Sequence, residues 1–268
     1  MFQTSEFSLQ RQSHFLSVLL MTNRKEEFSL VGFEKLLQNA QSQSYHFVTF
    51  SQKDQFKDKK RILLRHDIDN ELCQCLPLAQ AEAKLGIKAT YFIMLRSSAY
   101  NLLSLENRQI VLELLKLGHE IALHFQEKIA ASPDIMLQNI QNEVTVLENE
   151  FNTKVSAVSF HQPSPFVLEG HLLIPQLINT YNKEQMAPYH YLSDSNQEWR
   201  NNSAQQIIAD SSHKDLQILL HPMWWLHPGK NIKQIWQETL RQNNKQTVQH
   251  WLHHERTLQD AKEEDFLS

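Results

Sequence analysis

Glycine and cysteine are scarce in this chain of 268 residues, which contains 5 glycines and 2 cysteines. Average proteins contain roughly 7% glycine, so asparagine, serine, glutamine and proline must form most of the loops. Cys73 and Cys75 are two residues apart on an expected helix, where they point to different faces, and a disulfide between them would be strained. We therefore expect two buried or half-buried thiols and a reducing, cytoplasmic location.

Long apolar runs and basic clusters are also missing. No stretch reaches the ~20 apolar residues of a membrane-spanning helix, and the apolar run at 15–21 is not followed by a small-residue cleavage pattern. The net charge is −4, and the one basic cluster, 57–61, is too short for a nucleic-acid surface. We expect no membrane span, no signal peptide and no nucleic-acid partner, whereas the oligomeric state stays undetermined.

Short apolar, β-rich runs alternate with helical segments after residue 60. The best helix is Pro133–Phe151, which has Ser132 as a plausible N-cap, and Gly118 suits the end of the preceding helix. Strand–helix alternation predicts a parallel sheet, and six or seven such units predict a (β/α) barrel over 61–268. Residues 1–60 form an appendage packing on it, with a helix near 31–40 and a strand near 46–50. The runs are 61–66, 89–95, 120–124, 155–161, 189–193 and 216–221.

Polar and titratable residues follow the ends of these runs. In parallel α/β barrels that rim carries the active site, and three histidines with three aspartates there suit a divalent metal, zinc above all. Asp67 and Asp69 are two apart and point the same way on a strand. One of them should bind the cation while the other acts as a base, which fits metal-assisted hydrolysis. The six residues are Asp67, Asp69, His124, His161, Asp194 and His221.

Three segments resemble the polysaccharide deacetylase family, carbohydrate esterase family 4, over about residues 60–225. They are R-H-D-I-D at 65–69, A-T-Y-F at 89–92 and G-H-E-I-A-L-H at 118–124. S-F-H-Q-P at 159–163, H-P-M-W-W at 221–225 and Tyr100-Asn101 resemble a bacterial branch associated with surface-polysaccharide and O-antigen biosynthesis. The resemblance implies a deformed (β/α) barrel that hydrolyses an N-acetyl or O-acetyl group on a sugar.

The resemblance also implies roles for the carboxylates and the first histidine. Asp67 matches the general base and Asp69 the metal aspartate, and His124 matches the first metal histidine. The family usually has its two aspartates adjacent, so the extra Ile68 leaves open which carboxylate is base and which is ligand.

His221 matches the general acid in this resemblance. Asp194, with Trp199 close by, resembles the motif that orients that histidine, although a turn aspartate is the alternative. Trp224 and Trp225 either stack on a sugar ring or belong to the core or a lid. The expected substrate-binding residues are Arg65, His66, Arg96, Tyr100, Trp199, Arg200, Trp224 and Trp225.

Two positions depart from the family pattern. Lys128 stands where a second metal histidine is expected, and lysine is a poor ligand near neutral pH because it is protonated. His161 stands where the family has an arginine that contacts the catalytic carboxylate. We predict that His161 supplies the third metal ligand. The rival interpretation is that His161 hydrogen-bonds Asp67 while the metal is absent or held by His66.

The leading hypothesis is a metal-dependent deacetylase acting on a nucleotide-linked, lipid-linked or other small amino sugar during bacterial glycan biosynthesis. A hydrolase of non-sugar C–N bonds on the same fold is one alternative. The other is a pseudoenzyme without metal that binds a glycan or a partner.

Overall fold

The computed structural model describes residues 27–200 and 202–267, so the apolar run at 15–21 lies outside the described residues. The chain divides into two compact units. One is Glu26–Leu226, and the described part of the other is 227–267. Within the first unit, the strand Tyr45–Val48 pairs in parallel with the strand Lys60–Ile68.

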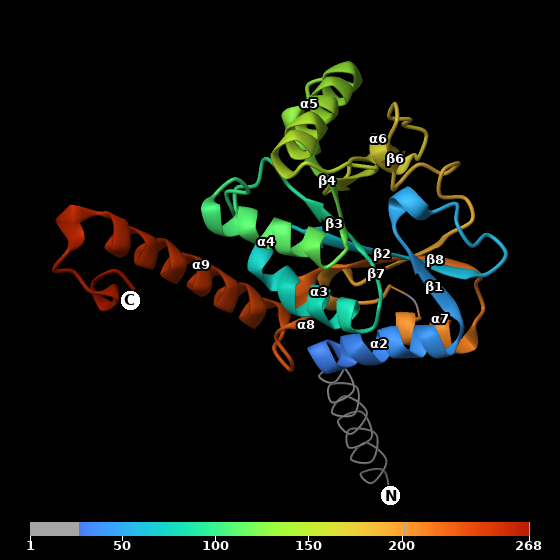
Figure 1. Cartoon of the computed structure of the whole chain (residues 1–268), viewed down its shortest axis with the longest axis horizontal. Helices are drawn as coiled ribbons and strands as arrows, with labels where there is room; N and C mark the ends of the chain where they lie inside the picture. Colours follow the sequence, from blue (N-terminus) through green and yellow to red (C-terminus); the bar gives the residue numbers. More distant parts are fainter. Residues whose placement is uncertain (1–26, 201, 268) are drawn as a thin grey trace, which may run out of the picture. The chain divides into compact units, whose positions relative to one another are not determined.

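A curled, all-parallel sheet forms the centre of the Glu26–Leu226 unit (Figure 1). Its order is β6-β5-β4-β3-β2-β8-β7, and β1 pairs with the first half of β2. Among the described residues, no ladder joins β6 to β7, so the barrel stays open at that point. The predicted deformed (β/α) barrel is confirmed. The strands are β1 (Tyr45–Val48), β2 (Lys60–Ile68), β3 (Thr90–Ile93), β4 (Glu120–Gln126), β5 (Ala157–His161), β6 (Ile178–Asn179), β7 (His190–Ser193) and β8 (Asp215–Leu220).

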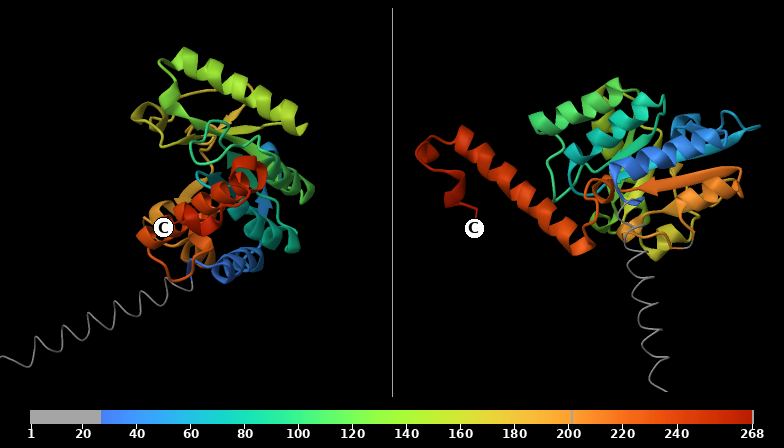
Figure 2. Two further views of the ribbon diagram at one scale, coloured as in Figure 1. Left: turned by 90° about the vertical axis from the view of Figure 1, so that its left-hand side faces the viewer. Right: turned by 90° about the horizontal axis from the view of Figure 1, so that it is seen from below.

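Helices lie around the outside of the sheet (Figures 1 and 2). The predicted helix Pro133–Phe151 is confirmed: the Ser132 hydroxyl accepts a hydrogen bond from the Ile135 amide, as an N-cap does. Gly118 follows the preceding helix with a left-handed φ of +91°. The helices of this unit are α2 (Leu30–Ser42), α3 (Cys75–Lys84), α4 (Leu105–Lys116), α5 (Pro133–Phe151), α6 (Pro165–Leu168), α7 (Ala204–Asp210) and α8 (Pro222–Trp225), with 3-10 turns η1 (Phe50–Gln52), η2 (Leu72–Gln74), η3 (Glu127–Ile129) and η4 (Ser195–Gln197).

The two cysteines differ in exposure. Cys75 is fully buried at the start of α3, as expected, whereas Cys73 is exposed on the turn η2. The expectation that both thiols are at least half-buried is wrong for Cys73, because the chain enters α3 through a 3-10 turn rather than through a continuous α-helix.

A charged pair lies in the barrel interior at the amino ends of β2 and β8, and an apolar cluster lies next along β2. Phe50 and Leu63 pack there with Phe92 and further small residues. Arg61 and Asp215 pair from neighbouring strands, with Nε–Oδ1 and Nη2–Oδ2 distances of 2.8 Å each. Both side chains are buried. The pair links β2 to β8 because Arg61 lies on one strand and Asp215 on the other.

The unit containing 227–267 consists of α9 (Ile232–His254) and the 3-10 turns η5 (Arg256–Leu258) and η6 (Glu263–Asp265). A capping box begins α9, in which Asn231 and Gln234 satisfy each other's backbone amides. Lys245 pairs with Glu263 at 3.1 Å, which holds the turn η6 near the helix. None of the helices among the described residues has the length and apolar character needed to cross a bilayer.

We predict that Asp215→Ala lowers the free energy of unfolding by about 3 kcal/mol, because it leaves a buried guanidinium without its carboxylate. The loss stays at the low end of the usual range because Arg61 keeps its hydrogen bond to the Lys53 carbonyl. Urea denaturation measures it. Glu113→Ala, which removes an exposed pair with Lys116, is the control and should change stability little. Equal losses in both variants would contradict the prediction.

Candidate metal centre and active site

The alternation of β2 divides the R-H-D-I-D segment between two faces. Arg65 and Asp67 face the barrel interior and bond to each other, whereas His66 faces the opposite way. Asp69 follows the last residue of β2 and continues the inward series. Three charged groups two residues apart thus rise in a row toward the carboxyl end of the strand.

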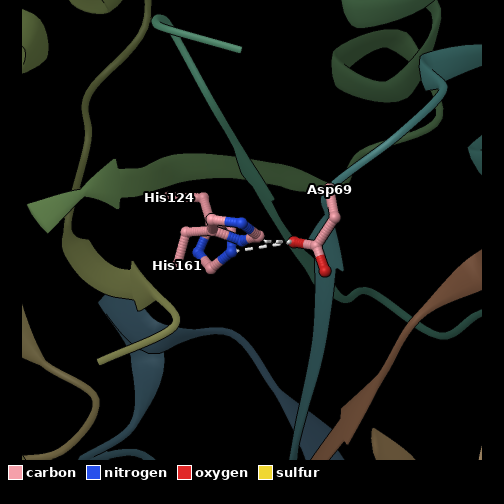
Figure 3. Close-up of side chains that lie close together, drawn as sticks. All are labelled: Asp69, His124 and His161. Carbon is pink, nitrogen blue, oxygen red and sulfur yellow. Dashed lines mark hydrogen bonds and ion pairs between the residues drawn. The ribbon is translucent and has the colours of Figure 1, made fainter. Parts of the chain in front are cut away.

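Asp69, His124 and His161 form a cluster at this end of the barrel. His124 Nε2 lies 2.9 Å and His161 Nδ1 lies 3.4 Å from the same Asp69 oxygen, Oδ1, and both rings point at that carboxylate (Figure 3). One ligand atom from each residue lies within 4.8 Å of the others. Ligands at 2.0–2.1 Å from a tetrahedral zinc are about 3.3 Å apart. The donor types and their spacing therefore fit a divalent ion.

Ser159 orients the His124 ring. The two residues are register partners on β4 and β5, and His124 Nδ1 lies 2.7 Å from the Ser159 hydroxyl. With its proton on Nδ1, the ring donates to Ser159, whose hydroxyl can donate to Asp67 Oδ1 at 3.5 Å. This tautomer leaves the Nε2 lone pair free for a metal, as outer hydrogen bonds do at zinc histidines.

Asp67 makes a two-pronged ion pair inside the barrel. Arg65 Nε and Nη2 donate to its two oxygens at 2.7 and 2.6 Å, and both side chains are buried. Burial by itself would raise the pKa of Asp67, but the charge of Arg65 outweighs burial and lowers that pKa. The carboxylate is therefore ionised at neutral pH.

Asp194 holds His221 from behind. Its carboxylate accepts hydrogen bonds from the His221 amide at 3.0 and 3.1 Å and lies 2.6 Å from the ring Nδ1, while Trp225 Nε1 donates to it at 2.8 Å. Asp194 is fully buried. Its geometry favours the orienting role over the turn aspartate. The other ring nitrogen, Nε2, lies 3.8 Å from Asp69 Oδ2.

The charges around His221 and Asp69 shift both groups. Burial lowers the pKa of His221, but the Asp194 carboxylate overrides it and, with Asp69 and Asp67, raises the pKa to about 9. Burial raises the pKa of Asp69, yet hydrogen bonds from His124 and His161 hold it well below its usual value. At neutral pH the site thus combines the ionised carboxylates of Asp67 and Asp69 with the cationic imidazole of His221.

A cleft open to solvent joins these groups. Asp67, Asp69, His221 and Met223 line it. Glu71 and Gln74, which follow β2, complete its wall. The carboxylates and His221 consequently face one common space.

None of the eight predicted substrate residues lines this cleft. His66 is fully buried, with Nε2 at 2.6 Å from Glu82 Oε1, because its place in the strand alternation turns it outward. This excludes His66 as the alternative metal ligand. Arg96 extends over the surface and donates to Glu143 at 2.7 Å. Neither reaches the cluster of Asp69.

The aromatic residues predicted to bind substrate serve the scaffold. Tyr100 donates to the Ile68 carbonyl and accepts from the Met94 amide, which ties the ends of β2 and β3 together. Trp199 Nε1 donates to Glu27. Trp224 and Trp225 are buried, which favours the core alternative for both. Arg200 is exposed.

Lys128 does not join the cluster, since its Nζ donates to Gln162 Oε1 at 3.1 Å. Arg65, and not a residue of the middle motif, contacts the Asp67 carboxylate. Sequence reasoning missed this pairing and the role of Ser159. The spacing of Arg65 and Asp67 on one strand face signalled the pair, whereas only the register of β4 and β5 reveals Ser159.

No family model and no curated protein matches the chain, but several solved structures do. A CE4 family pseudoenzyme from Bacillus anthracis is 13% identical, with a TM-score of 0.40, over 69% of this chain and 62% of that one. This protein thus spans less than two thirds of that chain.

Two further solved structures, an esterase and a deacetylase, match with similarly low sequence identities and TM-scores. A family 4 acetyl xylan esterase from Clostridium thermocellum, in complex with a cobalt ion, is 16% identical over 60% of this chain and 73% of that one, with a TM-score of 0.37. The catalytic domain of a peptidoglycan N-acetylglucosamine deacetylase from Eubacterium rectale is 17% identical over 69% and 86%, with a TM-score of 0.43. At these values the likeness carries no function over, and the chemistry must be argued from the side chains.

We predict that His161→Ala weakens zinc binding at least about 100-fold, because losing an outer partner alone costs about 10- to 100-fold and a direct ligand should cost more. Calorimetric titration of metal-free protein with zinc measures the affinity. His171→Ala removes an exposed histidine and should leave it unchanged. If His161→Ala retained the wild-type affinity, His161 would be a hydrogen-bonding residue instead.

The His221 ring should titrate with a pKa of about 9 in metal-free protein. Asp194→Asn removes the negative charge that raises this pKa, so the ring should lose its proton at lower pH in the variant. Ring-proton chemical shifts measured by NMR against pH give both values. An unchanged His221 titration in Asp194→Asn would contradict this origin of the shift.

Proposed function

We propose that the protein is a metal-dependent hydrolase that removes an acyl group, foremost acetyl, from an amino sugar in bacterial glycan biosynthesis. One observation carries the proposal: Asp69, which clusters with His124 and His161, lines one cleft together with an ionised carboxylate, Asp67, and a cationic imidazole, His221. The sugar and the O-antigen setting rest on the resemblance of the sequence motifs.

Asp69, His124 and His161 would hold the divalent metal, with zinc favoured by two imidazoles and one carboxylate. When bound, the ion would polarise the acyl carbonyl and make an adjacent water more acidic. Three protein ligands would leave at least one coordination position for water, as catalytic zinc sites do.

Asp67 is the general base in this proposal. Both of its oxygens are held by Arg65, so the carboxylate cannot rotate away, and Ser159 lies within 3.5 Å. Its lowered pKa keeps it ionised and able to accept the proton of the attacking water. Asp69, which both histidines approach, is the ligand, which assigns the two carboxylates to different tasks.

His221 is the general acid. The hydrogen bond with Asp194 engages Nδ1 of His221. Nε2 is therefore the nitrogen that faces the cleft and can deliver a proton to the leaving amine. A pKa of about 9 keeps the ring protonated at neutral pH. Water adds to the acyl carbon, the C–N bond breaks, and the products are a carboxylate and the free amine, with Asp67 and His221 handling the protons.

His221→Ala should lower the rate of acetate release by roughly 10²–10⁴-fold while zinc stays bound, because the leaving amine loses its proton donor. The assay measures acetate released by zinc-loaded protein from a panel of nucleotide-linked N-acetyl amino sugars. Zinc content of each variant is measured in parallel.

Lys128→Ala is the matched control, since Lys128 contacts Gln162 and not the cluster, and its rate should equal that of wild type. Wild-type turnover by His221→Ala on its best substrate would refute the role of His221. Zinc-loaded wild-type protein that releases acetate from none of these sugars, but hydrolyses a non-sugar amide, would favour the alternative C–N hydrolase.

A further inference from the structure

The barrel wall has a cavity where the sheet is open, between β6 and β7. Its volume is about 340 Å³, which lies within the range of small-molecule sites. Tyr181 and Lys183 follow β6, Tyr191 lies on β7 and Gln217 lies on β8. No described residue lines both this side cavity and the cleft beside Asp69, so the two are separate.

Gln217 is the unsatisfied group of the side cavity. It is 2% exposed, and its Nε2 donates to the Thr180 carbonyl at 3.5 Å. Its Oε1 accepts no hydrogen bond from any described residue. Exchanging the two amide atoms would place Oε1 against the Thr180 carbonyl, so the orientation is fixed. Buried acceptors are normally paired. Oε1 is covered in this structure, so a ligand would reach it only if neighbouring side chains shifted, and it would then have to supply a hydrogen-bond donor.

The other lining residues narrow the chemistry of that ligand. None of them is acidic and Lys183 is among them, so no carboxylate there would pair with a cation. Tyr181, Tyr189, Tyr191 and Met186 supply apolar surface, and a wholly apolar ligand would leave Gln217 unpaired. A ring with apolar faces and several hydroxyl donors satisfies both conditions.

The side cavity also touches the residues that hold Asp67 in place. Arg65 donates to the Thr180 hydroxyl at 3.0 Å and to the Tyr181 hydroxyl at 3.4 Å, and its guanidinium stacks over the Tyr181 ring. Both residues line the cavity. A ligand there would contact Thr180 and Tyr181, the two residues that bond to Arg65.

We propose that the side cavity is a second binding site that takes a saccharide ring, held by Gln217 and the tyrosines. The site does not depend on hydrolysis, because binding there needs neither the metal nor His221. A saccharide bound in it would stabilise Thr180 and Tyr181 and, through them, the position of Arg65.

The methyl signals of two methionines allow NMR to distinguish binding in the side cavity from binding in the cleft beside Asp69. Met186 lines the side cavity and Met223 lines the cleft. Metal-free protein labelled with ¹³C at the methionine methyl groups is titrated with N-acetylglucosamine, with glucose and, for contrast, with uridine monophosphate. We expect a saturable shift of the Met186 methyl with the saccharides.

Gln217→Leu, which removes the acceptor at similar size, and Tyr191→Ala, at a residue 43% exposed, should each weaken this response at least tenfold. Asp69→Ala should leave it unchanged. The proposal is overturned if only Met223 responds, if no saccharide shifts Met186, if uridine monophosphate alone does so, or if folded Tyr191→Ala binds like wild type. Acetate release without a Met186 response would keep the hydrolase and remove the side site.

Discussion

Two buried ion pairs, one above the other inside the barrel, determine where the reactive groups can lie. Arg61 and Arg65 both point inward from β2, and each holds an aspartate in two-pronged fashion. Unpaired charges at such depth would be costly, so Asp215 and Asp67 have little freedom. Because Asp67 is fixed, Asp69, two residues further along the same face, lies at the rim beside His124 of β4 and His161, the last residue of β5.

The rim assembles its charges from strands that are far apart in sequence. Asp69 comes from the end of β2, the two cluster histidines from β4 and β5, and His221 from the residue after β8. Opposite charges face each other there, which explains why the carboxyl pKa of Asp69 falls and the imidazole pKa of His221 rises. A cation entering the cluster would meet a carboxylate that is already ionised and therefore ready to coordinate.

Much of the fold follows from local signals in the sequence. Pro133–Phe151 carries a capping serine, a proline at its first position and an apolar face, and all three agree. β6 has only two residues, too few for any periodic pattern, so no sequence argument finds it. The sequence therefore predicts a barrel fold. It does not predict that the sheet stays open between β6 and β7.

Residues of the site could be predicted where strand periodicity determines the direction of the side chain. They could not be predicted where tertiary packing determines it. The phase of polar residues at strand ends indicated Asp69, His124, His161 and His221, which do lie together. The same alternation should have directed His66 away from the rim, toward Glu82. The sequence allows two interpretations of Trp224 and Trp225, as sugar-stacking residues or as core residues. Only tertiary contacts, such as the hydrogen bond from Trp225 to Asp194, distinguish these interpretations.

The parallel pairing of β4 with β5 has a consequence for how the protein matures. His124 faces Ser159 across this ladder, and Gln126 faces His161. Because neighbouring residues of a strand point to opposite faces, a slip of one residue would turn Ser159 away from His124 and remove His161 from the cluster. Metal capture would thus be a late event in folding, open only to chains whose strands have found their partners, and an ion once captured would lock that pairing in place.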